Sequence, residues 1–343
     1  MKTSVHIGRR SLSDFQATVD FVREAERLGV DCAWASEAWW TDAVTPLAYL
    51  AGQTTKIKLG SHIMQISART PAMTAMTAMT LNGMSNGRFI LGLGVSGPQV
   101  VEGLHGESYK GPLTRLKETV DIVRMAFRGE RLEYQGKYHQ LPLPGGEGKA
   151  LKLLHEPADI PVMLATLGPK ALEYTGASAD GWLGTSFSPD HPEALLPHIE
   201  RGAKSAGRRL SDLELQAACT VVIGENVEEL IDAQRAGVAF QMGAMGSART
   251  NFYNEAVQRA GYAEDAKAVQ SLWVAGKRDE ARQRVPDDMI VKFGAIGTPG
   301  MVRERFKVYK NAGITSLAFR FADNDANANI AQLEQAMDLV RDL

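Results

Sequence analysis

The sequence is poor in cysteine, which limits the chemistry that it can support. Only two cysteines, Cys32 and Cys219, occur in 343 residues, and both lie within apolar runs that are typical of strands. Free cysteine is among the most buried residue types, so we expect both thiols to pack in the core. Nothing in their number or spacing indicates a disulfide framework or a cysteine-based metal site.

The chain also lacks a concentration of charge and a long apolar run. Its 38 lysine and arginine residues nearly balance its 40 aspartate and glutamate residues, and the formal net charge is -2. No basic block occurs, so electrostatic binding of nucleic acid is not expected. No apolar run approaches the roughly 20 residues that a membrane helix needs, and the N-terminal residues contain no apolar signal-peptide core. We therefore expect a cytoplasmic protein without a membrane partner.

Signatures of metal and nucleophilic catalysis are missing as well. The seven histidines do not form H-E-x-x-H or a comparable ligand spacing, so no metal site is predicted. No G-x-S-x-G segment supports a serine nucleophile. His6 and His62 fall within strand-like runs, where a core histidine with satisfied hydrogen bonds is the ordinary interpretation. If His6 faces an active site, it can act as a proton donor near neutral pH.

What the sequence does contain is a regular alternation of strand-like and helix-like segments joined by short links. This alternation predicts a parallel sheet. Eight such units close a barrel, whereas an open doubly wound sheet usually has fewer. We therefore predict an α/β protein with the (β/α)8 TIM-barrel fold. The predicted strands are 4–8, 30–35, 57–64, 89–95, 160–165, 181–185, 213–223 and 314–321.

Two stretches depart from the simple repeat. Residues 131–159 contain a hairpin-like segment and a glycine-rich loop, and we interpret them as an excursion over the barrel mouth. Residues 227–313 are much longer than one crossover helix, and we expect them to be an insertion before strand eight, with several helices and a mobile segment near 275–286. Loops this long in a compact domain are usually functional. The whole chain, 1–343, is predicted to be a single domain.

Barrel enzymes place their active sites at the carboxyl ends of the strands, and two of these ends are glycine-rich. At Gly92–Gln99, glycines let a flat ring or a phosphate approach the backbone, and Ser96 is suited to cap a helix that has Pro98 in its first turn. The spacing is not G-x-G-x-x-G, and a simple tight turn would use the same glycines. Thr166–Lys170 is a second junction, where Pro169 is suited to open a helix and an ordinary turn is again the alternative.

A third strand end combines a carboxylate with aromatic side chains. Glu37 follows Ser36, and Trp39 and Trp40 come shortly after it. The two tryptophans can form the wall of a site for a planar ring, or they can simply cover the end of the barrel. The residues alone leave both alternatives open.

Taken together, these segments resemble the luciferase-like family, in the branch that depends on the deazaflavin coenzyme F420. That branch includes methylenetetrahydromethanopterin reductase and deazaflavin-dependent dehydrogenases. The matching segments keep the order of the family and cover nearly the whole chain. They are 25–31 with Ser36 and Glu37, 69–75, 81–88, 92–106, Gly168–Lys170 and 179–183.

The resemblance implies where the coenzyme would be held. A deazaflavin or flavin ring would lie in the barrel mouth against a bulge at the end of strand three. In relatives this bulge carries a non-prolyl cis peptide bond, which would fall within His62–Gln65 here and is expected at Ile63–Met64. Relatives are usually dimers, so a homodimer is expected. The implied cofactor-binding residues are Ser36, Ile63, Met64, Gln65, Gly94, Val95, Ser96, Gly97, Pro98, Gln99, Ala165, Thr166, Leu167, Gly168, Pro169 and Lys170.

The resemblance also implies an activity, that of an F420-dependent oxidoreductase. Such an enzyme transfers a hydride between the deazaflavin C5 and an organic substrate, here an unidentified small molecule. Glu37, His6 and Trp40 are the catalytic candidates: either of the first two would handle a proton, and Trp40 would flank the ring. Lys170 would neutralise the coenzyme phosphate.

Departures from the family narrow the substrate. Its sugar-phosphate dehydrogenases are similar to one another in having Asp-His after strand two and a glutamate after strand four. This chain has Glu37 and Ala38 at the first place and Gly97 at the second, so we do not expect glucose 6-phosphate as its substrate. Two alternatives to the F420 enzyme stay open, an FMN-dependent monooxygenase on the same fold and a barrel that binds a ligand without catalysis.

Overall fold

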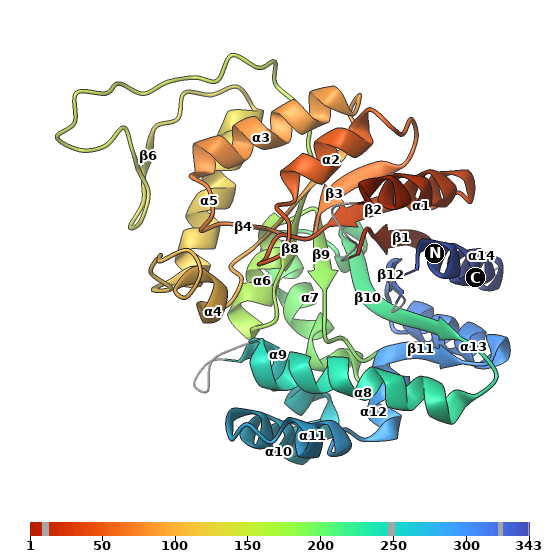
Figure 1. The fold of residues 1–343 in the computed structure, drawn as a ribbon. Coiled ribbons are helices and arrows are strands. Elements are labelled where there is room, and N and C mark those ends of the chain that lie inside the picture. Colours follow the sequence, from red (N-terminus) through yellow and green to blue (C-terminus); the bar gives the residue numbers. More distant parts are fainter. Residues whose placement is uncertain (9–13, 246–250, 322–324, 342) are drawn as a thin grey trace. The chain divides into compact units, whose positions relative to one another are not determined.

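The fold, drawn in Figure 1, comes from a computed structural model that describes residues 1–8, 14–245, 251–321, 325–341 and 343. The chain divides into two compact units. Unit 1 consists of Met1–Ala33 and Thr166–Leu343, and unit 2 consists of Trp34–Ala165. Both units contain parallel strands and the helices that connect them.

Unit 1 contains parallel strands from both ends of the chain. Strand β12 (Ser316–Arg320) pairs with β1 (Lys2–His6) and with β10 (Glu214–Ile223). The first part of β10 pairs with β9 (Gly181–Gly184), its middle with β12, and its last part with β11 (Gly294–Gly297). A single long strand therefore belongs to both the barrel sheet and the pairing with β11.

Unit 2 contains the strands β3 (Lys58–Ser61), β4 (Met64–Gln65), β5 (Phe89–Gly94) and β8 (Val162–Ala165). Strand β5 pairs in parallel with β3, β4 and β8. All six residues of β5 are buried, as is typical of a parallel strand that is covered on both faces.

The strand order in the sheet is β12-β1-β2-β3-β5-β8-β9-β10, with β2 at Cys32–Ala35, and β10 pairs again with β12. This ring of eight parallel strands is the predicted (β/α)8 TIM barrel, and each observed strand overlaps the range predicted for it. Cys32 and Cys219 are both buried, as expected.

Two of the connecting helices begin with a threonine cap followed by a proline. Thr70 precedes α3, its side chain accepts a hydrogen bond from the Met73 amide, and Pro71 occupies the first turn. Thr298 and Pro299 play the same parts for α13. The connecting helices are α1 (Phe15–Arg27), α2 (Val44–Ala51), α3 (Pro71–Met84), α4 (Pro98–Val101), α5 (Pro112–Phe127), α6 (Pro169–Ser178), α7 (Leu196–Ser205), α13 (Pro299–Asn311) and α14 (Ala326–Val340).

The predicted insertion before strand eight is a helical segment with a hydrophobic cluster of its own. It contains α8 (Val227–Ala244), α9 (Phe252–Val257), an irregular turn at Gln258–Tyr262, α10 (Ala263–Val274), α11 (Arg278–Gln283) and α12 (Asp287–Phe293). Buried side chains of these helices, among them Met242 and Val269, pack together with Ile296 of β11. The stretch that we expected to be mobile contains α11, whose Ala281 is fully buried within this cluster.

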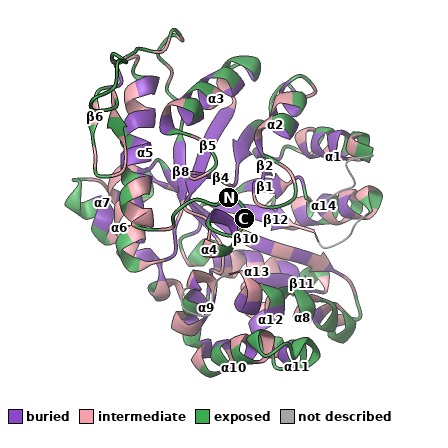
Figure 2. Cartoon of the chain, turned by 60° about the vertical axis from the view of Figure 1, so that its left-hand side comes forward, coloured by how far each residue is buried: buried purple, intermediate pink, exposed green. Residues whose placement is uncertain are grey.

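The excursion at 131–159 belongs to unit 2 and contains the predicted hairpin, formed by β6 (Tyr134–Gln135) and β7 (Gln140–Leu141). The buried carboxylate of Glu118, on α5, accepts hydrogen bonds from three successive amides of the hairpin, at residues 137, 138 and 139, at 2.7–2.9 Å. Figure 2 shows the chain of this excursion largely exposed beside α5. The carboxylate of Glu118 therefore attaches the hairpin to α5, together with the hydrogen bond from the Tyr134 hydroxyl to Asp121 (2.9 Å).

Helices α6 and α7 of unit 1 pack so closely that their contact requires glycine. A Cβ atom at Gly202 would lie 1.8 Å from the carbonyl oxygen of Glu173, and one at Gly176 would lie 1.9 Å from the carbonyl oxygen of Ile199. In both cases the overlapping atom belongs to the backbone, which cannot move aside without separating the helices.

We predict that Gly202→Ala lowers the free energy of unfolding by about 1–3 kcal/mol, because it overpacks this contact. Gly237→Ala is the matched control within α8, since a Cβ there meets nothing within 4 Å. The control is expected to stabilise the protein by up to about 1 kcal/mol, because alanine is the better helix former. Urea denaturation followed by circular dichroism measures both, and equal effects of the two substitutions would contradict the close helix contact.

Candidate active site

The end of strand three carries a one-residue bulge. Met64 lies four positions after Gly60, whereas their partners on β5, Leu93 and Ile90, are three positions apart. The peptide bond between His62 and Ile63 is cis. The bulge implied by the family resemblance is therefore present. The cis bond lies one residue earlier than the predicted Ile63–Met64, because the extra residue is accommodated before β4 resumes the pairing.

Two contacts fix the bulge against β5. The buried hydroxyl of Ser61 donates a hydrogen bond to the carbonyl oxygen of Gly92 (2.9 Å) and accepts one from its amide (3.0 Å). The side chain of Ile63 lies against Gly94, where a Cβ atom would be 3.2 Å from Ile63 Cδ1 and 3.4 Å from the carbonyl oxygen of Ala165. Glycine at position 94 therefore lets the half-buried Ile63 approach the end of β5.

The segment that follows β5 differs from the prediction in one detail. Ser96 adopts a left-handed conformation (φ +57°), and Gly97, not Ser96, is the residue that precedes α4. The expected cap by Ser96 is wrong because its backbone forms the turn into the helix and the helix starts one residue later, at Pro98. The Tyr109 hydroxyl donates a hydrogen bond to the Ser96 carbonyl oxygen (3.1 Å) and so supports this turn.

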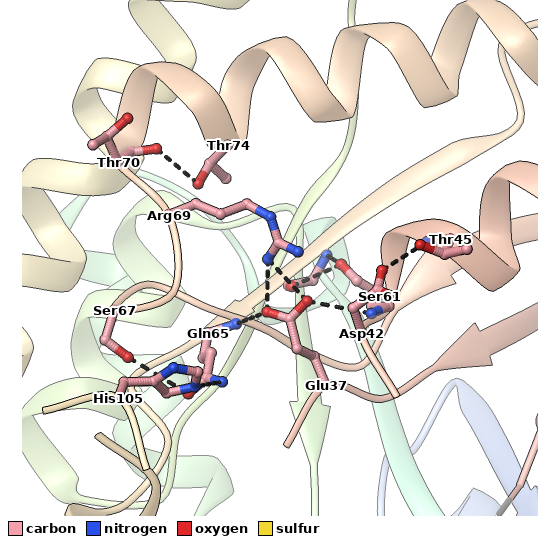
Figure 3. A network of polar contacts seen from close by, with 12 residues as sticks. Glu37, Asp42, Thr45, Ser61, Gln65, Ser67, Arg69, Thr70, Thr74 and His105 are labelled. Carbon is pink, nitrogen blue, oxygen red and sulfur yellow. Dashed lines mark hydrogen bonds and ion pairs between the residues drawn. The ribbon is translucent and has the colours of Figure 1, made fainter. Parts of the chain in front are cut away.

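Glu37 is buried, with 9% of its surface exposed, and lies at the centre of the polar network in Figure 3. Arg69 Nη1 is 2.7 Å from Glu37 Oε1 and 2.8 Å from Oε2. The carboxylate also accepts hydrogen bonds from the amides of Ala43 (3.2 Å) and Gln65 (3.4 Å). These partners suit Glu37 to hold the bulge in place, and its role in proton handling stays a prediction.

Gln65 connects the bulge to a histidine that the sequence analysis did not select. Gln65 Nε2 donates a hydrogen bond to His105 Nε2 (2.7 Å), and Ser67 Oγ donates one to Gln65 Oε1 (3.5 Å). A neutral imidazole that is protonated on Nδ1 satisfies the contact with Gln65. His105 lies in the 92–106 segment that resembles the family, and this was the only signal in the sequence that could have selected it.

A cavity of about 460 Å³ lies within unit 2 and shares Arg69 with this network. Its volume is in the usual range of small-molecule sites. The guanidinium of Arg115 lies 4.3 Å from the centroid of the Tyr138 ring, so the hairpin excursion supplies part of the wall. Tyr109, Arg115 and Tyr138 line the cavity. Sequence reasoning missed all three, because only the packing of the hairpin on α5 brings them together.

Unit 1 contains the other junction that was predicted to bind the cofactor, Thr166–Lys170. Trp182 Nε1 donates a hydrogen bond to the Thr166 carbonyl oxygen (2.9 Å), and the hydroxyls of Thr166 and Thr175 are 2.7 Å apart. Helix α6 begins at Pro169, as predicted, and Lys170 is exposed in its first turn. Hydrogen bonds therefore hold the junction at Thr166, whereas Lys170 at its other end is exposed and open to a ligand.

Arg259, from the insertion, reaches the same junction. Its Nη2 donates a hydrogen bond to the Leu167 carbonyl oxygen (2.9 Å), and its buried Nε has no hydrogen-bond partner in the part of the chain that the structure describes. Burial lowers the pKa of the Arg259 guanidinium. A cation next to a helix N-terminus favours an anionic ligand. The sequence did not reveal this residue, because it lies 92 positions from Leu167.

The remaining candidates lie at strand ends, as expected. His6 is the last residue of β1 and is half-buried. Ser36 and Trp40 are exposed, and 55% of the surface of Trp40 is accessible. Of the predicted residues, Glu37, Gln65, Ile63 and Gly94 belong to one connected structure in unit 2. The catalytic roles of His6 and Trp40 stay predictions.

Two expected absences concern only the residues that the structure describes. Within those ranges, no group of three or more histidine, cysteine, aspartate or glutamate side chains could hold a metal ion. No described helix is both long enough and apolar enough to cross a membrane.

A closed (β/α)8 barrel that has a cis-peptide bulge after strand three and a glycine-rich end on the next barrel strand defines a barrel enzyme of the luciferase-like type. The chain belongs to the luciferase-like monooxygenase family, whose model matches residues 2–316.

Its relatives include enzymes named for coenzyme F420. A Mycobacterium tuberculosis protein, provisionally named a coenzyme F420-dependent oxidoreductase, is 36% identical over 342 residues, which are 97% of this chain and 99% of that protein. The 5,10-methylenetetrahydromethanopterin reductase of Archaeoglobus fulgidus is 29% identical over 87% of each chain. The structure of the coenzyme F420-dependent tetrahydromethanopterin reductase of Methanopyrus kandleri is similar with a TM-score of 0.79 at 26% identity, over 99% of this chain and 96% of that one.

We predict that Glu37→Gln lowers the free energy of unfolding by about 2–4 kcal/mol, because it leaves Arg69 mostly buried without a charged partner. Adding Arg69→Met to Glu37→Gln is expected to recover part of this loss, since the unpaired charge is then removed. Glu304→Gln, which breaks the exposed pair with Lys307, is the control and should leave the unfolding midpoint unchanged. Additive effects of the two substitutions in urea denaturation would contradict the coupling.

Proposed function

We propose that this chain is an F420-dependent oxidoreductase that transfers a hydride between the deazaflavin C5 and a small organic substrate. The observation that carries the proposal is the bulge at the end of strand three, which is bonded to Gly92 through Ser61 and held by Glu37. Such a construction is suited to support a planar ring in a fixed position. Two of the similar proteins, the Mycobacterium tuberculosis protein and the Methanopyrus kandleri reductase, are named for coenzyme F420, and their names support this choice of cofactor.

Each unit, taken by itself, offers one of the two features that a cofactor with a flat ring and an anionic end requires. In unit 2, the backbone at Gly94 and at the half-buried residues 95–98, together with the Ile63 side chain, offers a surface that a flat ring can approach. In unit 1, the N-terminus of α6, Lys170 and the Arg259 guanidinium offer positive charge to a phosphate. When bound, F420 would supply the carbon that accepts or delivers the hydride.

The roles of the protein groups follow from their contacts. Glu37 and Arg69 would orient the bulge, and Gln65 would hold the His105 ring beside it. His6 or Glu37 would handle a proton and Trp40 would flank the ring, as the resemblance implies. The homodimer is likewise an expectation that rests on the family resemblance.

Binding of the cofactor is the first prediction of this proposal. Fluorescence titration of the purified protein is expected to give micromolar binding of F420 and much weaker binding of FMN. Tighter binding of FMN would instead favour the oxygen-dependent monooxygenase, which can be checked by substrate oxidation under air. Binding of neither cofactor would favour the barrel that has lost catalysis.

The charge at Arg259 gives a sharper prediction. Arg259→Leu is expected to weaken F420 binding by about 10–100-fold, because it removes a charged donor from the phosphate site. Arg201→Gln is the control, since this arginine is exposed on α7 and pairs with Glu173, and it should leave the dissociation constant unchanged. An unaltered affinity in Arg259→Leu would show that the phosphate is held elsewhere.

A further inference from the structure

Arg320 is a half-buried residue at the carboxyl end of β12. Phe319 stacks on Phe306 of the outer helix α13, with ring centroids 5.4 Å apart and an interplanar angle of 25°. Successive side chains of a strand point to opposite faces, so Arg320 points to the inner face of the sheet. In the register with β10 it stands beside Thr220. Active sites of barrel enzymes occupy this end and this face.

The side chain of Arg320 has no carboxylate partner among the described residues of the chain, although it is half-buried. Its electrostatic neighbours are the Tyr253 hydroxyl, from α9, and the Cys219 thiol, from β10. Burial raises the pKa of Tyr253, and it raises the pKa of Cys219 to about 12. Both neighbours are therefore neutral at physiological pH, and neither balances the charge.

Arg305, also in unit 1, shows how this chain pairs a guanidinium that has a structural role. Arg305 contacts both carboxylate oxygens of Asp190, at 3.3 and 2.8 Å, and also the Lys292 carbonyl oxygen at 2.6 Å. Arg320 has no comparable set of acceptors. Burial lowers the pKa of its guanidinium, as expected for a desolvated charge that has no carboxylate partner among the described residues.

We propose that Arg320 binds a carboxylate group of the substrate and that Tyr253 donates a second hydrogen bond to it. The enzyme would thus act on a small organic acid. A guanidinium matches a carboxylate with two parallel hydrogen bonds. The single positive charge of Arg320 balances one negative charge, which favours a carboxylate over a phosphate dianion. This inference rests on the proposed function, because it names the substrate class of the same site.

The test uses the protein loaded with F420 and two probes of similar shape, benzoate and the neutral benzamide. Calorimetric titration is expected to show that wild type binds benzoate and that Arg320→Met binds it at least tenfold more weakly. Benzamide should bind both proteins weakly and equally. Lys307→Met, which removes an exposed charge on α13, is the control and should bind benzoate like wild type. Equal binding of benzoate by wild type and Arg320→Met would overturn the proposal.

Three further readouts separate this role from others. The unfolding midpoint of Arg320→Met is expected to equal or exceed that of wild type, because an unpaired desolvated charge is removed, and a large fall would instead identify a structural residue. Loss of F420 binding in this variant would assign Arg320 to the cofactor and overturn the proposal. So would tighter binding of inorganic phosphate than of benzoate. If wild type binds benzoate through Arg320 but does not bind F420, the proposed function fails while the carboxylate site stands.

Discussion

The geometry of unit 2 depends on one buried carboxylate, because Glu37 receives donors from three separate parts of the chain. Arg69 comes from the loop before α3, Ala43 from the start of α2, and Gln65 from the second half of the bulge. A buried carboxylate needs such donors, so these segments must converge for the unit to fold. Their convergence places Gln65, and through it His105, beside the end of β5.

This arrangement explains how a bulge can be a fixed part of a site. The extra residue lies between β3 and β4 and interrupts their pairing with β5, and a free bulge could shift along the strand. Ser61 prevents that by exchanging two hydrogen bonds with Gly92, and the missing Cβ atom of Gly94 leaves room for Ile63.

Most of the fold could be predicted from the sequence, because strand and helix periods are local signals. The alternation of strands and helices was sufficient to predict eight barrel strands and the insertion. The sequence did not predict strand β11 and helix α13 as separate elements of the insertion, because Gly294–Gly297 is short and has no alternation of polar and apolar residues. The cis bond was placed one residue late, since a family resemblance fixes the bulge but not the bond. Ser96 was expected to cap a helix, but its left-handed backbone moves the start of α4 by one residue.

The site was predictable only where its residues lie at strand ends. Glu37, Gln65 and Gly94 could be selected by that rule. Tyr109, Arg115 and Tyr138 could not, because they meet only when the hairpin packs on α5. Arg259 and Arg320 were missed for another reason. Both were selected because partners are missing for them among the described residues, and a missing partner leaves no pattern in a sequence.

The length of β10 has a consequence for how such a protein can change over generations. Its first residues pair with β9 and β12 in the barrel, and its last residues pair with β11 and so carry the insertion on a strand ladder instead of a flexible loop. Residues can therefore be gained or lost between α8 and α12 without altering any pairing that closes the ring. Arg259 and Tyr253 both belong to that stretch. Under the proposed roles of these two residues, the part of the chain that is freest to diverge would also present charge and hydroxyl groups to ligands, and descendants of one barrel could exchange substrates while the ring of strands stays the same.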